Sequence, residues 1–147
     1  MWGEAQRRLF IFTDMANSIQ VYNGKSLIVN DLDIIAVMAF ALRLVPKMPE
    51  GNLLAHLAEQ WKRTLSEYAP GAIDLELDKL MHSTSEIEAL VALFSEIRTE
   101  LSQYGEIVPA SVLNEMNTVE GVKFFDYRSE AIVKAAKSLG ELLGEGK

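Results

Sequence analysis

The sequence contains no cysteine, and this absence removes several classes of protein at once. The chain has no disulfide scaffold, no zinc site built on thiolates, no iron-sulfur cluster and no thiol nucleophile. It does not need such staples, because a chain of this length buries roughly 70% of its unfolded surface in one core. The content of 49% hydrophobic and 24% charged residues is that of a folded chain. We therefore expect a single helical domain over residues 1–147.

Histidine is almost as scarce as cysteine, since the chain has only His56 and His82. Phosphate-binding loops, dinucleotide-binding turns, nucleophile elbows and HExxH helices are absent from the sequence. We expect His56 to lie on the polar face of a helix, in solvent. His82 follows Asp78 by four residues, so on a helix the two side chains could pair, or His82 could cap the helix end. We predict no catalytic residues, no cofactor and no metal, and a non-enzymatic role is favoured.

One acidic segment is similar to the opening of a calcium-binding loop. Asp74, Glu76 and Asp78 alternate along it, but the position after Asp78 is lysine where the loop requires glycine. The twelfth position, counted from Asp74, is Ser85 where the loop requires glutamate. The segment is therefore not expected to form an EF-hand.

Long hydrophobic runs are also missing. Arg7 and Arg8 precede the apolar run 9–12, which is too short for the core of a secretory signal. The longest apolar stretch, Ile34–Leu42, is about half of what a bilayer requires. We expect a cytoplasmic protein that does not contact a membrane.

Apolar residues recur with helical spacing along most of the chain, and we predict an all-α fold, a compact bundle of five or six helices. The stretch Ile34–Leu42 is apolar on all sides, so its helix should lie at the centre of the bundle or in a dimer interface. One expected helix begins at the capping residues Ser83–Ser85 and ends at Tyr104. The other helices expected after residue 30 are Asp31–Val45, Asn52–Tyr68, Ile73–Met81, Pro109–Asn117 and Asp126–Gly144, and Val119–Phe125 is expected to be a loop.

Two segments fit a second interpretation. Glu4–Tyr22 has a helical apolar face, but Asn23-Gly24 between alternating residues is also a strong hairpin signal. An α+β fold with a short N-terminal hairpin around Asn23-Gly24 is therefore the alternative. In Ile73–Met81, apolar and acidic residues alternate at first, yet a helical face fits as well, and we favour a short helix.

The negative charge is concentrated in the middle of the chain. Between Thr64 and Glu120, eleven acidic residues face only Lys79 and Arg98, which gives a net charge of −9. The segments before and after each carry +1, so together they give the total of −7. Such a field repels phosphate, which argues against nucleic acid and anionic lipid as partners. It favours a basic protein partner, although an acidic surface can also serve solubility alone.

We predict that a partner contacts two sets of acidic residues. One set lies on the segment 74–78, and the other forms a row of carboxylates on the long helix that follows. These residues are Asp74, Glu76, Asp78, Glu86, Glu88, Glu96 and Glu100.

Three hypotheses for the function fit the sequence. The first hypothesis is a protein-binding domain, for example an immunity or antitoxin-type inhibitor. The second is a structural or adaptor subunit that forms a homodimer or larger assembly through Ile34–Leu42 and Phe124-Phe125. The third is a small enzyme or ligand-binding bundle whose carboxylates converge with tyrosines, namely Tyr22, Tyr68, Tyr104 and Tyr127.

Overall fold

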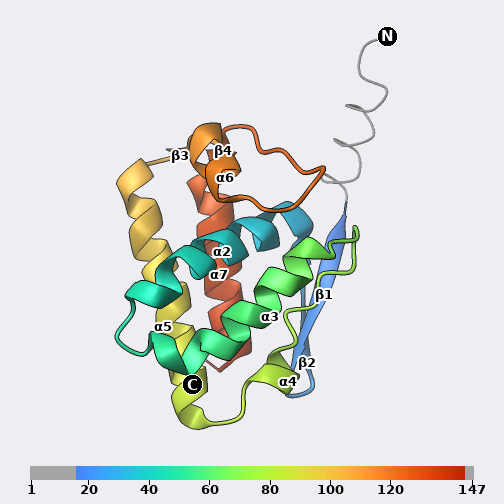
Figure 1. Ribbon diagram of the computed structural model, residues 1–147, viewed down its shortest axis with the longest axis vertical. Helices are drawn as coiled ribbons and strands as arrows, with labels where there is room; N and C mark the ends of the chain where they lie inside the picture. Colours follow the sequence, from blue (N-terminus) through green and yellow to red (C-terminus); the bar gives the residue numbers. More distant parts are fainter. Residues whose placement is uncertain (1–15, 145–147) are drawn as a thin grey trace.

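The computed structural model describes residues 16–144, which form a helix-rich fold with two small antiparallel hairpins (Figure 1). The prediction of a purely all-α bundle is wrong, and the alternative with a hairpin at Asn23-Gly24 is confirmed. The helices are α2 (Asp31–Leu44), α3 (Ala55–Ser66), α4 (Leu77–Leu80), α5 (Thr84–Leu101), α6 (Ala110–Met116) and α7 (Ser129–Leu142). The strands are β1 (Asn17–Tyr22), β2 (Lys25–Asn30), β3 (Ile107–Val108) and β4 (Tyr127–Arg128).

Turn chemistry decides the structure of the first hairpin. Asn23 and Gly24 both have a positive φ, 52° and 79°, which is the geometry of the tight two-residue turns that join antiparallel strands. The backbone N–H of Asn23 also donates a hydrogen bond to the Asp78 carboxylate at 2.9 Å. The predicted helix Glu4–Tyr22 is therefore wrong for residues 17–22, which form β1, while residues 4–15 lie outside the described part of the chain.

Helix α2 is the centre of the core. The Asn30 side chain caps it by accepting a hydrogen bond from the backbone of Leu32, and a 3-10 turn containing Pro46 follows its last residue. Residues 34–41 are all buried, and α3, α5, α6 and α7 pack around them. The apolar stretch therefore lies inside the bundle rather than in a dimer interface.

The predicted helix Asn52–Tyr68 is shorter in the structure because its start is a 3-10 turn at Gly51–Leu54. A Cβ on Gly51 would lie 2.1 Å from the Val45 carbonyl oxygen, so only glycine allows this close approach. Within α3, the apolar stripe is buried as predicted, and the Trp61 indole donates a hydrogen bond to the Leu75 carbonyl at 3.1 Å.

The predicted helix Ile73–Met81 is wrong in its first half, and only α4 at Leu77–Leu80 is helical. Before α4 the chain alternates, with Ile73 and Leu75 buried and Asp74 exposed. A helix does not form there because side chains of β1 bind the backbone N–H and C=O groups that helical bonds would use.

The C-terminal half follows the sequence pattern more closely. Helix α5 begins after the Ser83 cap, which accepts a hydrogen bond from the Glu86 backbone. It packs along α7. Helix α6 and the loop at Val119–Phe125 lie where they were expected. Strands β3 and β4 form a second small hairpin that was not predicted, and because β4 uses Tyr127 and Arg128, α7 begins at Ser129 rather than at Asp126.

Asp31, the first residue of α2, is fully buried and holds three distant segments together. Its carboxylate accepts hydrogen bonds from the Ser18 hydroxyl at 2.6 Å, the Tyr68 hydroxyl at 3.0 Å and the Gly71 backbone N–H at 2.8 Å. A buried carboxylate is tolerated only with such partners, and the N-terminal dipole of α2 stabilises the charge further. Burial and the hydrogen bond to Asp31 raise the pKa of Tyr68, so its hydroxyl stays protonated and continues to donate.

Asp33 joins the same turn of α2 to β4. Its carboxylate accepts a hydrogen bond from the Tyr127 hydroxyl in β4. Burial raises the pKa of Asp33, while the Tyr127 hydrogen bond and the charge of Lys134 act in the opposite direction. The first turn of α2 is therefore joined to β1, to the chain after α3 and to β4.

We predict that Asp31→Ala lowers the free energy of unfolding by about 3 kcal/mol, because buried donors lose their acceptor. Tyr68→Phe removes only one of these hydrogen bonds, and we expect a loss of about 1 to 2 kcal/mol. The control Glu120→Ala, at an exposed loop position, should change the value by less than about 0.5 kcal/mol. Urea unfolding followed by circular dichroism measures all three. An Asp31→Ala protein as stable as the parent would show that this network does not hold the fold.

A second prediction concerns pH. Because the pKa of Asp33 is higher in the folded chain than its ordinary value of 3.8, its protonated form favours folding. That contribution is complete below pH 3.8 and is lost as the pH rises through the folded pKa. Asp33→Asn resembles the protonated form at every pH. The variant should therefore match the parent at low pH and gain stability relative to it towards neutral pH.

Urea unfolding of both proteins across this pH range measures the difference. The exposed carboxylate Glu96 on α5 supplies the control, and Glu96→Gln should run parallel to the parent. A constant difference between Asp33→Asn and the parent would contradict the raised pKa.

Candidate functional site

Strand β1 has an inverted pattern, with polar side chains inside and aliphatic side chains outside. Ser18 and Gln20 are 1% and 0% exposed, whereas Ile19 and Val21 are 58% and 47% exposed. On β2, Ile28 lies directly opposite Ile19 and is 67% exposed. These three aliphatic residues, Ile19, Val21 and Ile28, share one outer side of the hairpin, and we call them the hairpin face.

The buried polar side chains explain the inversion. Gln20 donates a hydrogen bond to the Ile73 carbonyl at 2.7 Å and accepts one from the Leu75 N–H at 2.9 Å. Ser18 accepts a hydrogen bond from the Ile73 N–H at 3.0 Å. Because successive residues of a strand point to opposite sides, turning Ser18 and Gln20 inward turns Ile19 and Val21 outward. The polar contacts, rather than hydrophobic burial, therefore set which side of β1 faces solvent.

Asp74, Glu76 and Asp78 lie along the segment whose backbone Ser18 and Gln20 bind, and we call these three residues the acidic edge. Asp74 is exposed and accepts a hydrogen bond from the Glu76 backbone at 2.8 Å. Glu76 is partly buried, accepts a hydrogen bond from Gln60 and lies 3.4 Å from the Lys79 ammonium group. Asp78 is exposed and binds the hairpin turn through Asn23. The edge thus presents two exposed carboxylates, Asp74 and Asp78, and Asp78 contacts the hairpin at its turn.

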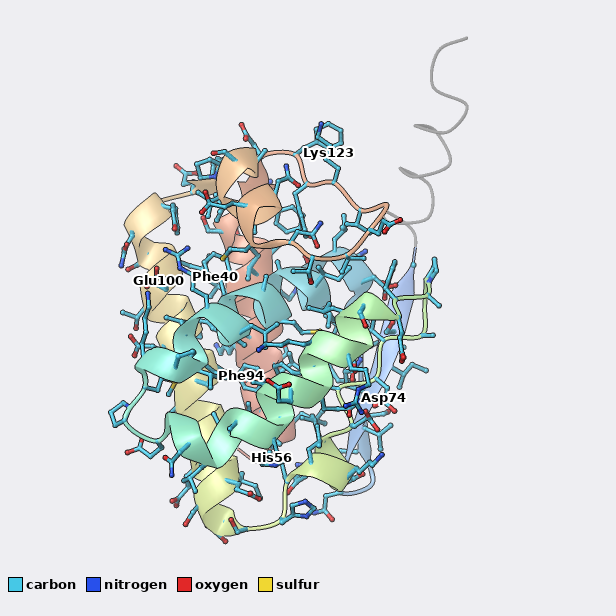
Figure 2. All side chains as sticks on the ribbon, in the orientation of Figure 1. Phe40, His56, Asp74, Phe94, Glu100 and Lys123 are labelled. Carbon is cyan, nitrogen blue, oxygen red and sulfur yellow. The ribbon has the colours of Figure 1, made fainter. Side chains whose placement is uncertain are left out.

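The other predicted acidic residues do not join this edge. On α5, Glu88 and Glu96 are exposed and Glu100 is half-buried. Figure 2 shows Glu100 and Asp74 at opposite sides of the molecule. At 100° per residue, the four glutamates of α5 spread over about 160° of its circumference, so they do not form one row. The structure brings together the first three predicted residues and separates them from Glu88, Glu96 and Glu100.

Glu86 belongs to a different cluster, which contains both histidines. One of its oxygens accepts a hydrogen bond from the His82 backbone at 2.6 Å, and the other lies 3.8 Å from His56 Nε2. The two imidazole rings stack with centroids 6.0 Å apart, and His56 Nε2 is 2.8 Å from the Leu80 carbonyl oxygen. The predicted pairing of His82 with Asp78 is not formed. His56 is exposed, as expected, and also lies in this cluster.

Neither a metal centre nor a membrane span emerges from the part of the chain that the structure describes. No group of three or more histidine, aspartate or glutamate side chains in residues 16–144 is arranged to hold a metal ion. None of the described helices combines the length and apolar character needed to cross a bilayer. The third hypothesis requires tyrosines and carboxylates that can bind a ligand. The hydroxyls of Tyr68 and Tyr127 are instead hydrogen-bonded to Asp31 and Asp33.

Comparisons with models of protein families, with curated proteins and with solved structures find no match for this chain. Its function must therefore be argued from its own residues.

Proposed function

We propose that this protein is a non-enzymatic protein-binding domain that contacts its partner through the hairpin face and the acidic edge. The observation that carries the proposal is the exposure of Ile19, Val21 and Ile28 side by side on one side of the hairpin. Single exposed aliphatic residues are ordinary, but a cluster is characteristic of interaction surfaces. Burying one such side chain in a complex contributes about 1.5 to 3 kcal/mol.

The partner that fits this surface has an aliphatic or aromatic centre bordered by lysine or arginine. Protein interfaces commonly combine an apolar centre with a polar rim, and here the rim carries the carboxylates of Asp74 and Asp78. The net charge of −9 between Thr64 and Glu120 would also accelerate association with a basic protein. An immunity or antitoxin-type inhibitor acting in the cytoplasm is one kind of protein with these properties.

A second copy of the chain fits the surface less well. The net charge of −9 between Thr64 and Glu120 would make two copies repel each other, whereas it would attract a basic protein. The homodimer is therefore an alternative outcome of the test below.

The interior gives little support to an enzyme. Among the described residues, every buried side-chain nitrogen or oxygen has a hydrogen-bond partner. The carboxylates nearest to tyrosines, Asp31 and Asp33, are anchors of α2. In residues 16–144, no buried side-chain nitrogen or oxygen is therefore left unpaired to bind a substrate.

Selection from a displayed library of random peptides tests the proposal without a known partner. We expect the purified protein to enrich peptides that combine lysine or arginine with large apolar residues. Ile28→Lys should reduce this enrichment at least about tenfold, because a charge would replace the centre of the hairpin face. Asp74→Asn retains the side-chain oxygen that binds the Glu76 backbone and should weaken binding chiefly at low salt.

Glu96→Gln is the matched control, since it removes one exposed carboxylate on α5, outside the acidic edge. It should leave the enrichment unchanged. Circular dichroism would show that Ile28→Lys is folded, which we expect for an exposed position. Enrichment of acidic or uncharged peptides, or equal enrichment by Ile28→Lys, would contradict the proposal. Sedimentation of the parent as a dimer that Ile28→Lys converts to a monomer would show that a second copy is the partner.

A further inference from the structure

A cleft of about 570 Å³ lies where α5 ends and α7 begins, and it involves neither the hairpin face nor the acidic edge. Figure 1 shows this end of the molecule, beside the labels β3 and β4. The C-terminal turn of α5, the chain at Gly105–Ile107 and the residues around the start of α7 form its walls. The volume is within the range of small-molecule sites, which is about 300 to 1,000 Å³.

The two helix ends at the cleft have opposite polarity. Helices α5 and α7 pack together and run in opposite directions, so the negative end of α5 and the positive end of α7 meet here. No side chain caps α7. The backbone N–H of Ser129 donates to the Glu106 carbonyl at 2.9 Å, and the buried Ser129 hydroxyl donates to the Gly105 carbonyl. These bonds hold the chain carrying Glu106 against the start of α7.

The charged side chains of the cleft are balanced. Arg98 and Arg128 line it together with Glu106 and Glu130. Arg128 and Glu130 are 3.7 Å apart and 78% and 82% exposed, and such exposed ion pairs contribute little, so a ligand can replace one partner readily. A simple anion would meet the two carboxylates, and a simple cation would meet the two guanidinium groups. The lining is therefore best matched by a ligand that carries both charges.

The remaining lining is aliphatic. Leu101 is buried at the base of the cleft, Val133 is partly buried and Ile107 is 45% exposed. Val133 and Ile107 leave apolar surface next to the charged groups, whereas Leu101 leaves none. A ligand that covers Val133 and Ile107 would remove this surface from water, which favours binding.

We infer that the cleft binds a small zwitterion with an aliphatic side chain, such as an aliphatic α-amino acid. The carboxylate of the ligand lies at the start of α7, beside Arg128. Its ammonium group lies near Glu106 and the end of α5, and its side chain covers Val133 and Ile107. Arginine suits the carboxylate because its planar group donates two parallel hydrogen bonds. This site is independent of the proposed protein-binding surface.

Calorimetric titration with three matched probes tests the inference on the full chain. L-leucine carries both charges, 4-methylpentanoate lacks the ammonium group and 3-methylbutylamine lacks the carboxylate. We expect L-leucine to bind at least about tenfold more tightly than either analogue, since each analogue lacks one of the two charged groups that the lining would bind. Arg128→Gln and Glu106→Gln should each weaken binding of L-leucine by a similar factor.

Arg63→Gln on α3 and Glu96→Gln on α5 lie outside the cleft and should bind L-leucine like the parent. Circular dichroism would establish that each variant is folded. The absence of L-leucine binding at millimolar concentration would overturn the inference. Equal binding of 4-methylpentanoate would also overturn it, because the cleft would then be an anion site. Neither result bears on the peptide selection with Ile28→Lys, which tests the hairpin face alone.

Discussion

The buried carboxylate of Asp31 is the interaction on which the arrangement of the N-terminal half depends. Asp31 is the first residue of the central helix α2. Its carboxylate accepts hydrogen bonds from Ser18 in β1 and from Tyr68 and Gly71, which follow α3. A charge in the interior is unfavourable unless its partners are all in place, so these segments take up one arrangement together. Asp33 extends the same principle to β4 through Tyr127. The first turn of α2 is thus a polar anchor at the edge of an apolar core.

The surface of the hairpin follows from this anchor. Asp31 holds Ser18, and Ser18 and Gln20 bind the backbone of Ile73 and Leu75, so the polar side of β1 must face inward. The pleat of the strand then leaves Ile19 and Val21 in solvent. The proposed protein-binding surface is therefore a consequence of how the fold is held together. Substitutions of Asp31 and Ile28 distinguish stability from partner binding, because Asp31 holds the hairpin in place and Ile28 is exposed for contact.

The elements that local chemistry controls could be predicted from the sequence. The caps at Ser83–Ser85 and the helical spacing of apolar residues indicated α5. The apolar character of Ile34–Leu42 on all sides indicated the central position of α2. The hairpin was only an alternative, because a helical stripe that includes Ile19 competes with the Asn23-Gly24 turn signal. Which side of β1 is buried could not be inferred, since it depends on hydrogen bonds to residues 73–75, more than fifty positions away. For the same reason, the non-helical form of 73–76 was missed.

The seven predicted carboxylates do not share one surface, because Asp74, Glu76 and Asp78 lie together while Glu88, Glu96 and Glu100 lie elsewhere on α5. The cleft had no sequence signal, as its residues meet only through the packing of α5 against α7.

The central claim is that the network around Asp31 fixes the side of β1 that faces solvent. Native-state hydrogen exchange of the Asp31→Asn variant tests it most directly, because this change keeps the size of the side chain and removes its charge. The account predicts faster exchange at the amides of Ile73 and Leu75 and along β1, with exchange in the middle of α5 close to that of the parent. If the β1 amides exchanged as in the parent, or if all regions accelerated equally, Asp31 would not be the anchor of the hairpin.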